Sequence, residues 1–251
     1  MSETKRLRLF AGPNGSGKST LFDHLVKSGA FHSYYHVNPD MIMLDLKKSL
    51  DFDNWGISLS HDEFFHFLES SPLQSLASVR FNELLTCRDN TVSFKDPSSV
   101  NNSYLNAAIA DFIRFKMVQS ESSFSFETIL SHKSKLEEVE EAKKAGYKIY
   151  LYFITTSNPV INENRVKNRV ESGGHDVPPE KIRERYYRTM DNLYGAFQLA
   201  DRAYFFDNST RSTNNIFDFF AEKKGNKLQL SEDFPKWFYE RVLNRMAGND
   251  N

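Results

Sequence analysis

The stretch that decides the fold is "RLFAGPNGSGKSTL", which runs from Arg8 to Leu21. Within it, residues 12–19 satisfy the pattern G-x-x-x-x-G-K-[ST], which is typical of loops that bind the phosphates of a nucleotide. Glycines let backbone N–H groups approach the phosphates closely, and the helix that follows adds its N-terminal dipole. The sequence therefore predicts a strand, a phosphate-binding loop and a helix, in this order.

The side chains of this loop predict ATP and Mg²⁺ as ligands. We expect Lys18 to reach the β- and γ-phosphates and the hydroxyl of Ser19 to bind Mg²⁺. The other residues expected to contact the nucleotide are Gly12, Pro13, Asn14, Gly15, Ser16, Gly17 and Thr20. The alternative interpretation is a glycine-rich connection that carries a surface lysine.

Composition narrows the class of protein. The chain has 251 residues, of which 39% are hydrophobic, and this is enough for one sizeable core. A formal net charge of -1 gives no basic field, so nucleic acid is not the expected partner. The single cysteine excludes an internal disulfide and fits a reducing cytoplasm. No apolar run approaches the length of a membrane span, and no signal peptide is expected.

Strand-like segments alternate with helical ones along the chain. The expected strands are Lys5–Phe10, Ser33–Asn38, Ser122–Glu127, Lys148–Thr155 and Arg202–Ser209. This alternation predicts an α/β fold with a parallel sheet flanked by helices. We expect one P-loop domain over residues 1–251, with a partly helical insertion at 49–103. A C-terminal extension at 211–251 is expected to form a hairpin and a helix.

Carboxylates follow two of the expected strands. Asp40 comes directly after the second strand, where the carboxyl ends of parallel strands meet a ligand. A carboxylate there can accept the proton of an acceptor hydroxyl, although Asp is also a common helix N-cap. Glu127 and Thr128 end the third strand, and we expect them to bind substrate. Their alternative role is to cap the helix that follows.

Arginines are concentrated in the segment "ENRVKNRVESGGHDVPPEKIRERYYR". Arg165 and Arg169 are four residues apart and therefore share one face of a helix. Placed over ATP, such arginines neutralise charge on the phosphoryl group that is being transferred. A solvated basic helix face is the alternative. Together with the carboxylates, the cluster favours phosphoryl transfer over simple hydrolysis.

Six segments, in order, resemble the zeta-toxin-like P-loop kinases, and in particular their compact branch, often labelled predicted ABC-type ATPases. They are "AGPNGSGKST", "NPD", "FETILS", "AGYKIYLYFI", "RVKNRVESGGHDVPPEKIRERYYRTMDNL" and "FFDNS". The resemblance covers about residues 5–48 and 104–210. It implies a five-stranded sheet in the order 2-3-1-4-5, with ATP and Mg²⁺ as ligands.

The resemblance also implies roles for individual residues. It makes Asp40 the general base, places Arg165 and Arg169 over the phosphates, and puts Asn208 near the adenine. A simple turn at Asp207–Thr210 is the alternative for Asn208. The acceptor in zeta toxins is a UDP-N-acetyl amino sugar. The insertion leaves the identity of the acceptor open, and the sequence also leaves open whether an antitoxin pairs with the chain. An ATP-binding or ATP-hydrolysing module without an acceptor, or a nucleoside or polynucleotide kinase, remains the alternative.

Overall fold

The computed structural model describes residues 4–32, 35–96, 102–171, 177–210 and 217–248. They form two compact units: residues 1–32 with 127–251, and residues 33–126. The predicted insertion at 49–103 lies within the second unit, which extends beyond it on both sides. Four predicted features lie partly outside the described residues: the second strand at residues 33–34, the insertion at 97–101, the arginine-rich segment at 172–176, and the C-terminal extension at 211–216 and 249–251.

The main sheet is built mostly by the first unit. Its strands are β1 (Arg6–Ala11), β6 (Phe124–Thr128), β7 (Lys148–Thr155), β8 (Arg202–Asp207), β9 (Asp218–Lys224) and β10 (Lys227–Leu230), joined by β2 (His36–Val37) of the second unit. The hydrogen-bonded order is β10-β9-β8-β7-β1-β6-β2. The expected order 2-3-1-4-5 is confirmed for β2-β6-β1-β7-β8. The expected C-terminal hairpin adds β9 and β10 to the same sheet, next to β8, so the whole sheet has seven strands and not five.

The central strands are apolar because both of their faces are covered. β1 pairs in parallel with β7, from Arg6 opposite Lys148 to Ala11 opposite Phe153, and β7 pairs in parallel with β8. Almost every residue of β7 is buried, as is typical of parallel strands between two helical layers. The C-terminal hairpin is confirmed, and its first strand pairs antiparallel with β8.

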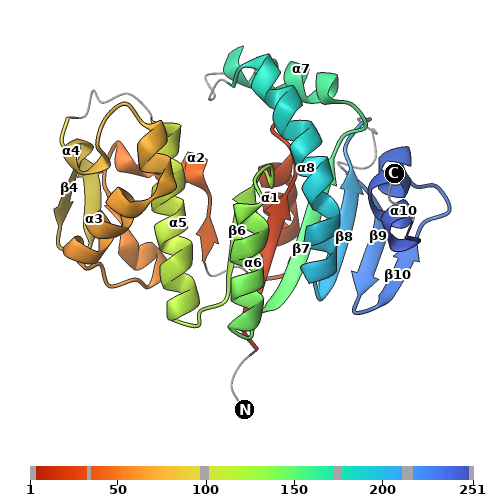
Figure 1. Ribbon diagram of the computed structural model, residues 1–251, viewed down its shortest axis with the longest axis horizontal. Helices are drawn as coiled ribbons and strands as arrows, with labels where there is room; N and C mark the ends of the chain where they lie inside the picture. Colours follow the sequence, from red (N-terminus) through yellow and green to blue (C-terminus); the bar gives the residue numbers. More distant parts are fainter. Residues whose placement is uncertain (1–3, 33–34, 97–101, 172–176, 211–216, 249–251) are drawn as a thin grey trace. The chain divides into compact units, whose positions relative to one another are not determined.

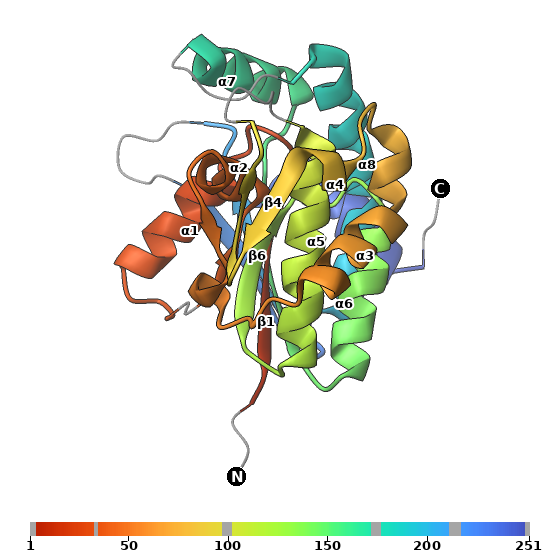
Figure 2. The ribbon, with the colours of Figure 1, turned by 90° about the vertical axis from the view of Figure 1, so that its left-hand side faces the viewer.

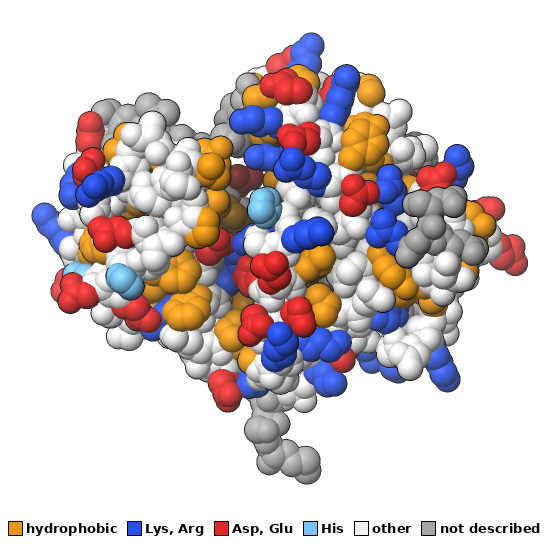
Figure 3. All heavy atoms as spheres, in the orientation of Figure 1, with side chains coloured by type: hydrophobic (Ala, Val, Ile, Leu, Met, Phe, Trp, Pro, Cys, Tyr) orange, Lys and Arg blue, Asp and Glu red, His pale blue; other side chains and the backbone are white. Residues whose placement is uncertain are grey.

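Helices cover the two faces of the sheet in the first unit. Helix α1 (Lys18–Lys27) lies on one face, whereas α6 (Ser134–Lys144) and α8 (Pro179–Leu199) lie on the other, as Figures 1 and 2 show. Helix α7 (Pro159–Glu171) follows β7 and packs on α8. Charged side chains of both signs are interspersed over α6, α7 and α8 on the face in Figure 3.

The second unit combines helices with a small antiparallel sheet. Its elements are β2, α2 (Pro39–Leu46), β3 (Leu50–Asp51), η1 (Phe52–Trp55), α3 (His61–Ser70), η2 (Pro72–Leu76), α4 (Phe81–Leu84), β4 (Leu85–Arg88), β5 (Thr91–Phe94) and α5 (Ser103–Gln119). The small sheet has the order β3-β5-β4. The buried rings of Phe52, Phe64 and Phe112 form its aromatic centre, with centroids 5.1–6.0 Å apart.

The C-terminal residues form the predicted helix in three pieces. These are α9 (Lys236–Phe238), the π-helical turn η3 (Tyr239–Leu243) and α10 (Asn244–Met246). The indole N–H of Trp237 donates to a carboxylate oxygen of Asp207 at 2.7 Å, which ties this extension to the end of β8. Within the described part of the chain, every helix is too short or too polar to cross a lipid bilayer.

Candidate phosphate-binding site

The phosphate loop joins β1 to α1 in a conformation that requires glycine. A Cβ on Gly12 would lie 2.0 Å from the carbonyl oxygen of Ile154, and one on Gly17 would lie 2.7 Å from Nδ2 of Asn208. Gly17 has φ +101°, in the left-handed region that residues with side chains rarely adopt. Helix α1 starts without a capping side chain and without an acidic residue in its first turn. Its N-terminus therefore favours an anion.

Lys18 is held across the start of the loop. Its ammonium donates to the carbonyl oxygens of Gly12 at 2.9 Å and Pro13 at 3.0 Å. Nearby, the buried hydroxyl of Ser16 has no hydrogen-bond partner among the described residues, and neither has the side-chain oxygen of Asn14. Buried polar atoms of this kind are rare unless a ligand or water satisfies them. The loop thus has both a cation and unsatisfied polar atoms for a phosphate ligand.

Two oxygen-bearing side chains, those of Ser19 and Glu127, meet at the edge of the loop. The hydroxyl of Ser19, in the first turn of α1, donates to Oε2 of Glu127 at 2.9 Å. Glu127 is 9% exposed and lies near the end of β6. Mg²⁺ in nucleotide sites prefers one or two protein oxygens together with phosphate oxygens. The pair fits such an ion, and no larger cluster of metal-binding side chains exists within the described ranges. Thr20, beside Ser19, is exposed.

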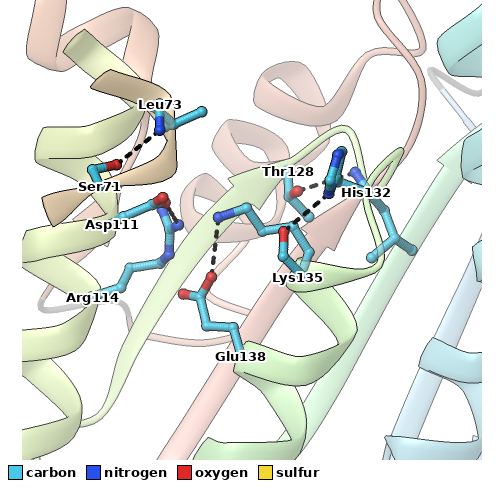
Figure 4. Close-up of polar contacts among 10 residues, drawn as sticks. Ser71, Leu73, Asp111, Arg114, Thr128, His132, Lys135 and Glu138 are labelled. Atoms are coloured by element: carbon cyan, nitrogen blue, oxygen red, sulfur yellow. Dashed lines mark hydrogen bonds and ion pairs between the residues drawn. The ribbon is translucent and has the colours of Figure 1, made fainter. Parts of the chain in front are cut away.

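Thr128 closes a turn that holds β6 against the phosphate loop. Its carbonyl oxygen accepts from the N–H of Gly12 at 3.2 Å, and its hydroxyl accepts from the N–H of Leu130 at 3.0 Å. Figure 4 shows Thr128 at this turn, ahead of α6. The alternative role for Thr128 as a helix cap is wrong, because Lys133 occupies the N-cap position of α6.

Asp40 lies in the second unit, on the first turn of α2. The cap of this helix is Asn38, whose side-chain oxygen accepts from the N–H of Asp40 at 2.9 Å. The alternative interpretation of Asp40 as the N-cap is therefore wrong. The Asp40 side chain is exposed to solvent.

Four arginines of the arginine-rich segment lie on two helices, α7 and α8. Arg165, on α7, is half-buried, and its guanidinium lies 3.5 Å from the side-chain oxygen of Asn208. Arg169 is one turn further and exposed. On α8, Arg183 pairs with Glu163, and Arg188 pairs with Glu184. These two exposed ion pairs contribute little to stability.

Two asparagines contact the phosphate loop from other elements. Asn208, at the end of β8, donates from Nδ2 to the carbonyl oxygen of Ser16 at 2.8 Å. Asn162, on α7, donates to the carbonyl oxygen of Asn14 at 2.6 Å. Sequence reasoning placed Asn208 near the adenine and missed Asn162. No local pattern marks either contact, because the partners are far apart along the chain.

A separate concavity lies on the second unit. It has a volume of about 590 Å³ and is lined by nine residues that include His61, Arg80, Cys87 and Lys95. Burial raises the pKa of the Cys87 thiol to about 11, so the thiol stays protonated at neutral pH. None of the predicted site residues lines this concavity.

Comparisons of the sequence with known proteins give one partial match. No family model matches the chain. A 69-residue segment is 32% identical to an uncharacterized protein of Haemophilus influenzae, which covers 28% of this chain and 49% of that protein. The chain thus spans about half the length of the curated relative that it matches.

Solved structures resemble nearly the whole chain. The AvrRxo1-ORF1:ORF2 complex with ATP contains a chain with a TM-score of 0.56 and 14% identity, over 96% of this chain and 64% of that chain. A structure of the PezAT toxin–antitoxin system of Streptococcus pneumoniae matches with a TM-score of 0.50 and 12% identity, over 96% of this chain and 80% of that chain. At such identities the likeness establishes the fold, and it confirms the fold that the sequence motifs predict.

Proposed function

We propose that this chain, which has the fold of the zeta-toxin-like P-loop kinases, transfers the γ-phosphoryl group of ATP to the hydroxyl of a small molecule. The observation that carries this proposal is the contact between Ser19 and Glu127 at the edge of the phosphate loop. It joins the hydroxyl of Ser19, which follows Lys18 in the phosphate-loop motif, to a carboxylate, and such a pair of oxygens is suited to binding the Mg²⁺ of a nucleotide. The AvrRxo1 complex solved with ATP supports nucleotide binding at the level of the fold.

Each residue has a stated role in this proposal. Lys18 exchanges its two carbonyl contacts for phosphate oxygens, and Arg165 and Arg169 offset charge on the phosphoryl group. Asp40 accepts the proton of the attacking hydroxyl, a role that its exposed carboxylate is free to take because Asn38 caps the helix. Mg²⁺, when bound at Ser19 and Glu127, neutralises phosphate charge.

The proposed acceptor is a nucleotide sugar such as a UDP-N-acetyl amino sugar, which contacts Glu127 and Thr128. The proposed protein partner is an antitoxin, since both matched structures are complexes whose names describe paired or toxin–antitoxin components. We propose a cytoplasmic location, where ATP is available. Two alternatives stay open: an ATP-binding or ATP-hydrolysing module without an acceptor, and a nucleoside or polynucleotide kinase.

A radiolabel experiment tests the proposal. The chain is incubated with γ-labelled ATP, Mg²⁺ and, separately, UDP-N-acetylglucosamine, a nucleoside mixture, a short oligonucleotide or no acceptor. We expect label on the nucleotide sugar, and none from Lys18→Ala. Lys27→Ala, at the other end of the same helix, is the matched control and should keep full activity. Label found only as free phosphate would support the ATPase alternative. Label on the nucleoside or oligonucleotide would support the other kinase class.

A further inference from the structure

Helix α7 is joined to the phosphate loop through one buried side chain, Asn162. This side chain is 0% exposed. Its amide N–H group donates to the carbonyl oxygen of Asn14 at 2.6 Å, and its oxygen accepts from the hydroxyl of Thr156. One side chain therefore satisfies both the carbonyl oxygen of Asn14, which needs a donor, and the hydroxyl of Thr156, which needs an acceptor. Asparagine can do this because its amide carries both groups, whereas an ionised aspartate has acceptors only.

The backbone of α7 also lies directly on the loop. The carbonyl oxygen of Asn162 is 2.7 Å from the place where a Cβ on Gly15 would stand, and a methyl group of Val166 is 3.2 Å from it. No side chain fits between the loop and the helix at this point. The position of α7 and the conformation of the loop are consequently linked.

A second side-chain amide, that of Asn208, holds another carbonyl of the loop, two residues after Asn14. Nδ2 of Asn208 donates to the carbonyl oxygen of Ser16 at 2.8 Å. Its side-chain oxygen lies 3.5 Å from the guanidinium of Arg165, one turn along α7 from Asn162. Two loop carbonyls, those of Asn14 and Ser16, are therefore each held by an asparagine from outside the loop.

Because the peptide bond is planar, a contact that holds a loop carbonyl also fixes the direction of the N–H group that follows it. In a trans peptide the C=O and the following N–H point in opposite directions. A carbonyl of Asn14 that is held toward α7 directs the N–H of Gly15 the other way, into the loop. A carbonyl of Ser16 held by Asn208 does the same for the N–H of Gly17. These are the backbone donors that a phosphate loop uses.

We propose that Asn162 and Asn208 are positioning residues that orient the amide groups of Gly15 and Gly17 for the phosphates of ATP. The inference rests on the proposed function for its ligand, but it concerns ATP binding alone and needs no acceptor. It also links the arginine-bearing helix to the loop, because Asn162 lies on α7 and Asn208 contacts Arg165.

The test measures ATP affinity of the full chain directly, by calorimetry with Mg²⁺ and without acceptor. Asn162→Asp keeps the size of the side chain and its acceptor toward Thr156 but has no donor for Asn14. Asn208→Ala removes the donor for Ser16 from a half-buried position, and it remains informative if Asn162→Asp does not fold. Each variant is expected to bind ATP about 5- to 100-fold more weakly, the usual cost of an unsatisfied buried carbonyl.

A matched control separates positioning from general stability. Asn192 on α8 donates its amide to the carbonyl oxygen of Leu130 at 2.9 Å, in the turn after β6 and not within the phosphate loop itself. Asn192→Asp also removes an amide donor from a backbone carbonyl, so it should lower the unfolding midpoint but leave ATP affinity unchanged. Asn162→Asp and Asn208→Ala are expected to lose affinity for ATP and ADP but not for AMP, because AMP has no β-phosphate to occupy the loop.

The outcomes distinguish this inference from the proposed function. Folded Asn162→Asp and Asn208→Ala chains that bind ATP within about twofold of the wild type would overturn it, as would equal losses for ATP and AMP. A wild-type chain that binds ATP but labels no acceptor would overturn the proposed function only. A wild-type chain that binds no ATP would overturn both.

Discussion

Replacing Asp40 by Asn separates catalysis from helix stability in this chain. The substitution keeps the size of the side chain but removes its ability to take a proton. Asn38, and not Asp40, supplies the cap of α2, so the capping hydrogen bond at 2.9 Å survives. The only expected structural cost is the interaction of one carboxylate with the helix dipole, about 0.3–1 kcal/mol.

The kinetic cost is expected to be much larger. General base catalysis contributes about 100- to 10,000-fold, which corresponds to roughly 3–5 kcal/mol of activation free energy. Acceptor-dependent kcat of Asp40→Asn should fall by this factor, while the Kd for ATP stays nearly unchanged. The measurement is a steady-state assay with the acceptor found by radiolabelling, together with thermal unfolding of the same sample.

The second unit offers a matched control at an equivalent helix position. Asp62 is the second residue of α3, after the cap residue Ser60, and is exposed like Asp40. Asp62→Asn should change the unfolding midpoint as little as Asp40→Asn does and leave kcat intact. A kcat of Asp40→Asn within about threefold of the wild type would refute the general-base role. Equal losses of activity in both variants would show that helix electrostatics, and not proton transfer, causes the effect.

Two further predictions concern stability and the loop. Gly15 and Gly29 share φ +71°, but a Cβ on Gly15 would lie 2.7 Å from the oxygen of Asn162, whereas nothing stands within 4 Å at Gly29. Gly29→Ala should cost about 1–2 kcal/mol in urea unfolding and keep ATP binding, whereas Gly15→Ala should cost more and abolish binding. Burial raises the pKa of Tyr152 to about 12, above its ordinary value of 10.0, so its contribution to stability is complete below pH 10 and disappears as the pH rises through 12. Between pH 8 and 11 the unfolding free energy of Tyr152→Phe should fall less than that of the wild type. An equal fall in the two proteins would contradict this prediction.

The sequence predicts the phosphate loop and the order of the parallel strands because both have local patterns. Glycine spacing identifies the loop, and apolar runs separated by helices identify the strands. The extension of the sheet was missed because the turn at Gly225 predicts a hairpin but does not say which strand the hairpin joins. Pairing of β9 with β8 depends on packing between distant segments.

The candidate site was predicted in part, for a related reason. Lys18 and Ser19 follow from the motif, and the end of β6 was a predicted polar site. The contacts of Asn162 and Asn208 with the loop join residues that are far apart in the chain, so no periodicity reveals them. The cap of α2 was missed although Asn38 and Asp40 are close together in the sequence. Both are good cap residues, and only the backbone geometry decides between them.

The pairing of β1 with β7 also determines when the nucleotide site can form during synthesis. Arg6 pairs with Lys148 and Ala11 with Phe153. At about 5–20 residues per second, a ribosome needs on the order of ten seconds between making these two strands. During that interval the apolar side chains of Leu7, Leu9 and Phe10 have no partner in β7. The nucleotide motif is therefore made early but completed late, and a nascent chain that ends before Lys148 has the whole motif without the strand that supports it.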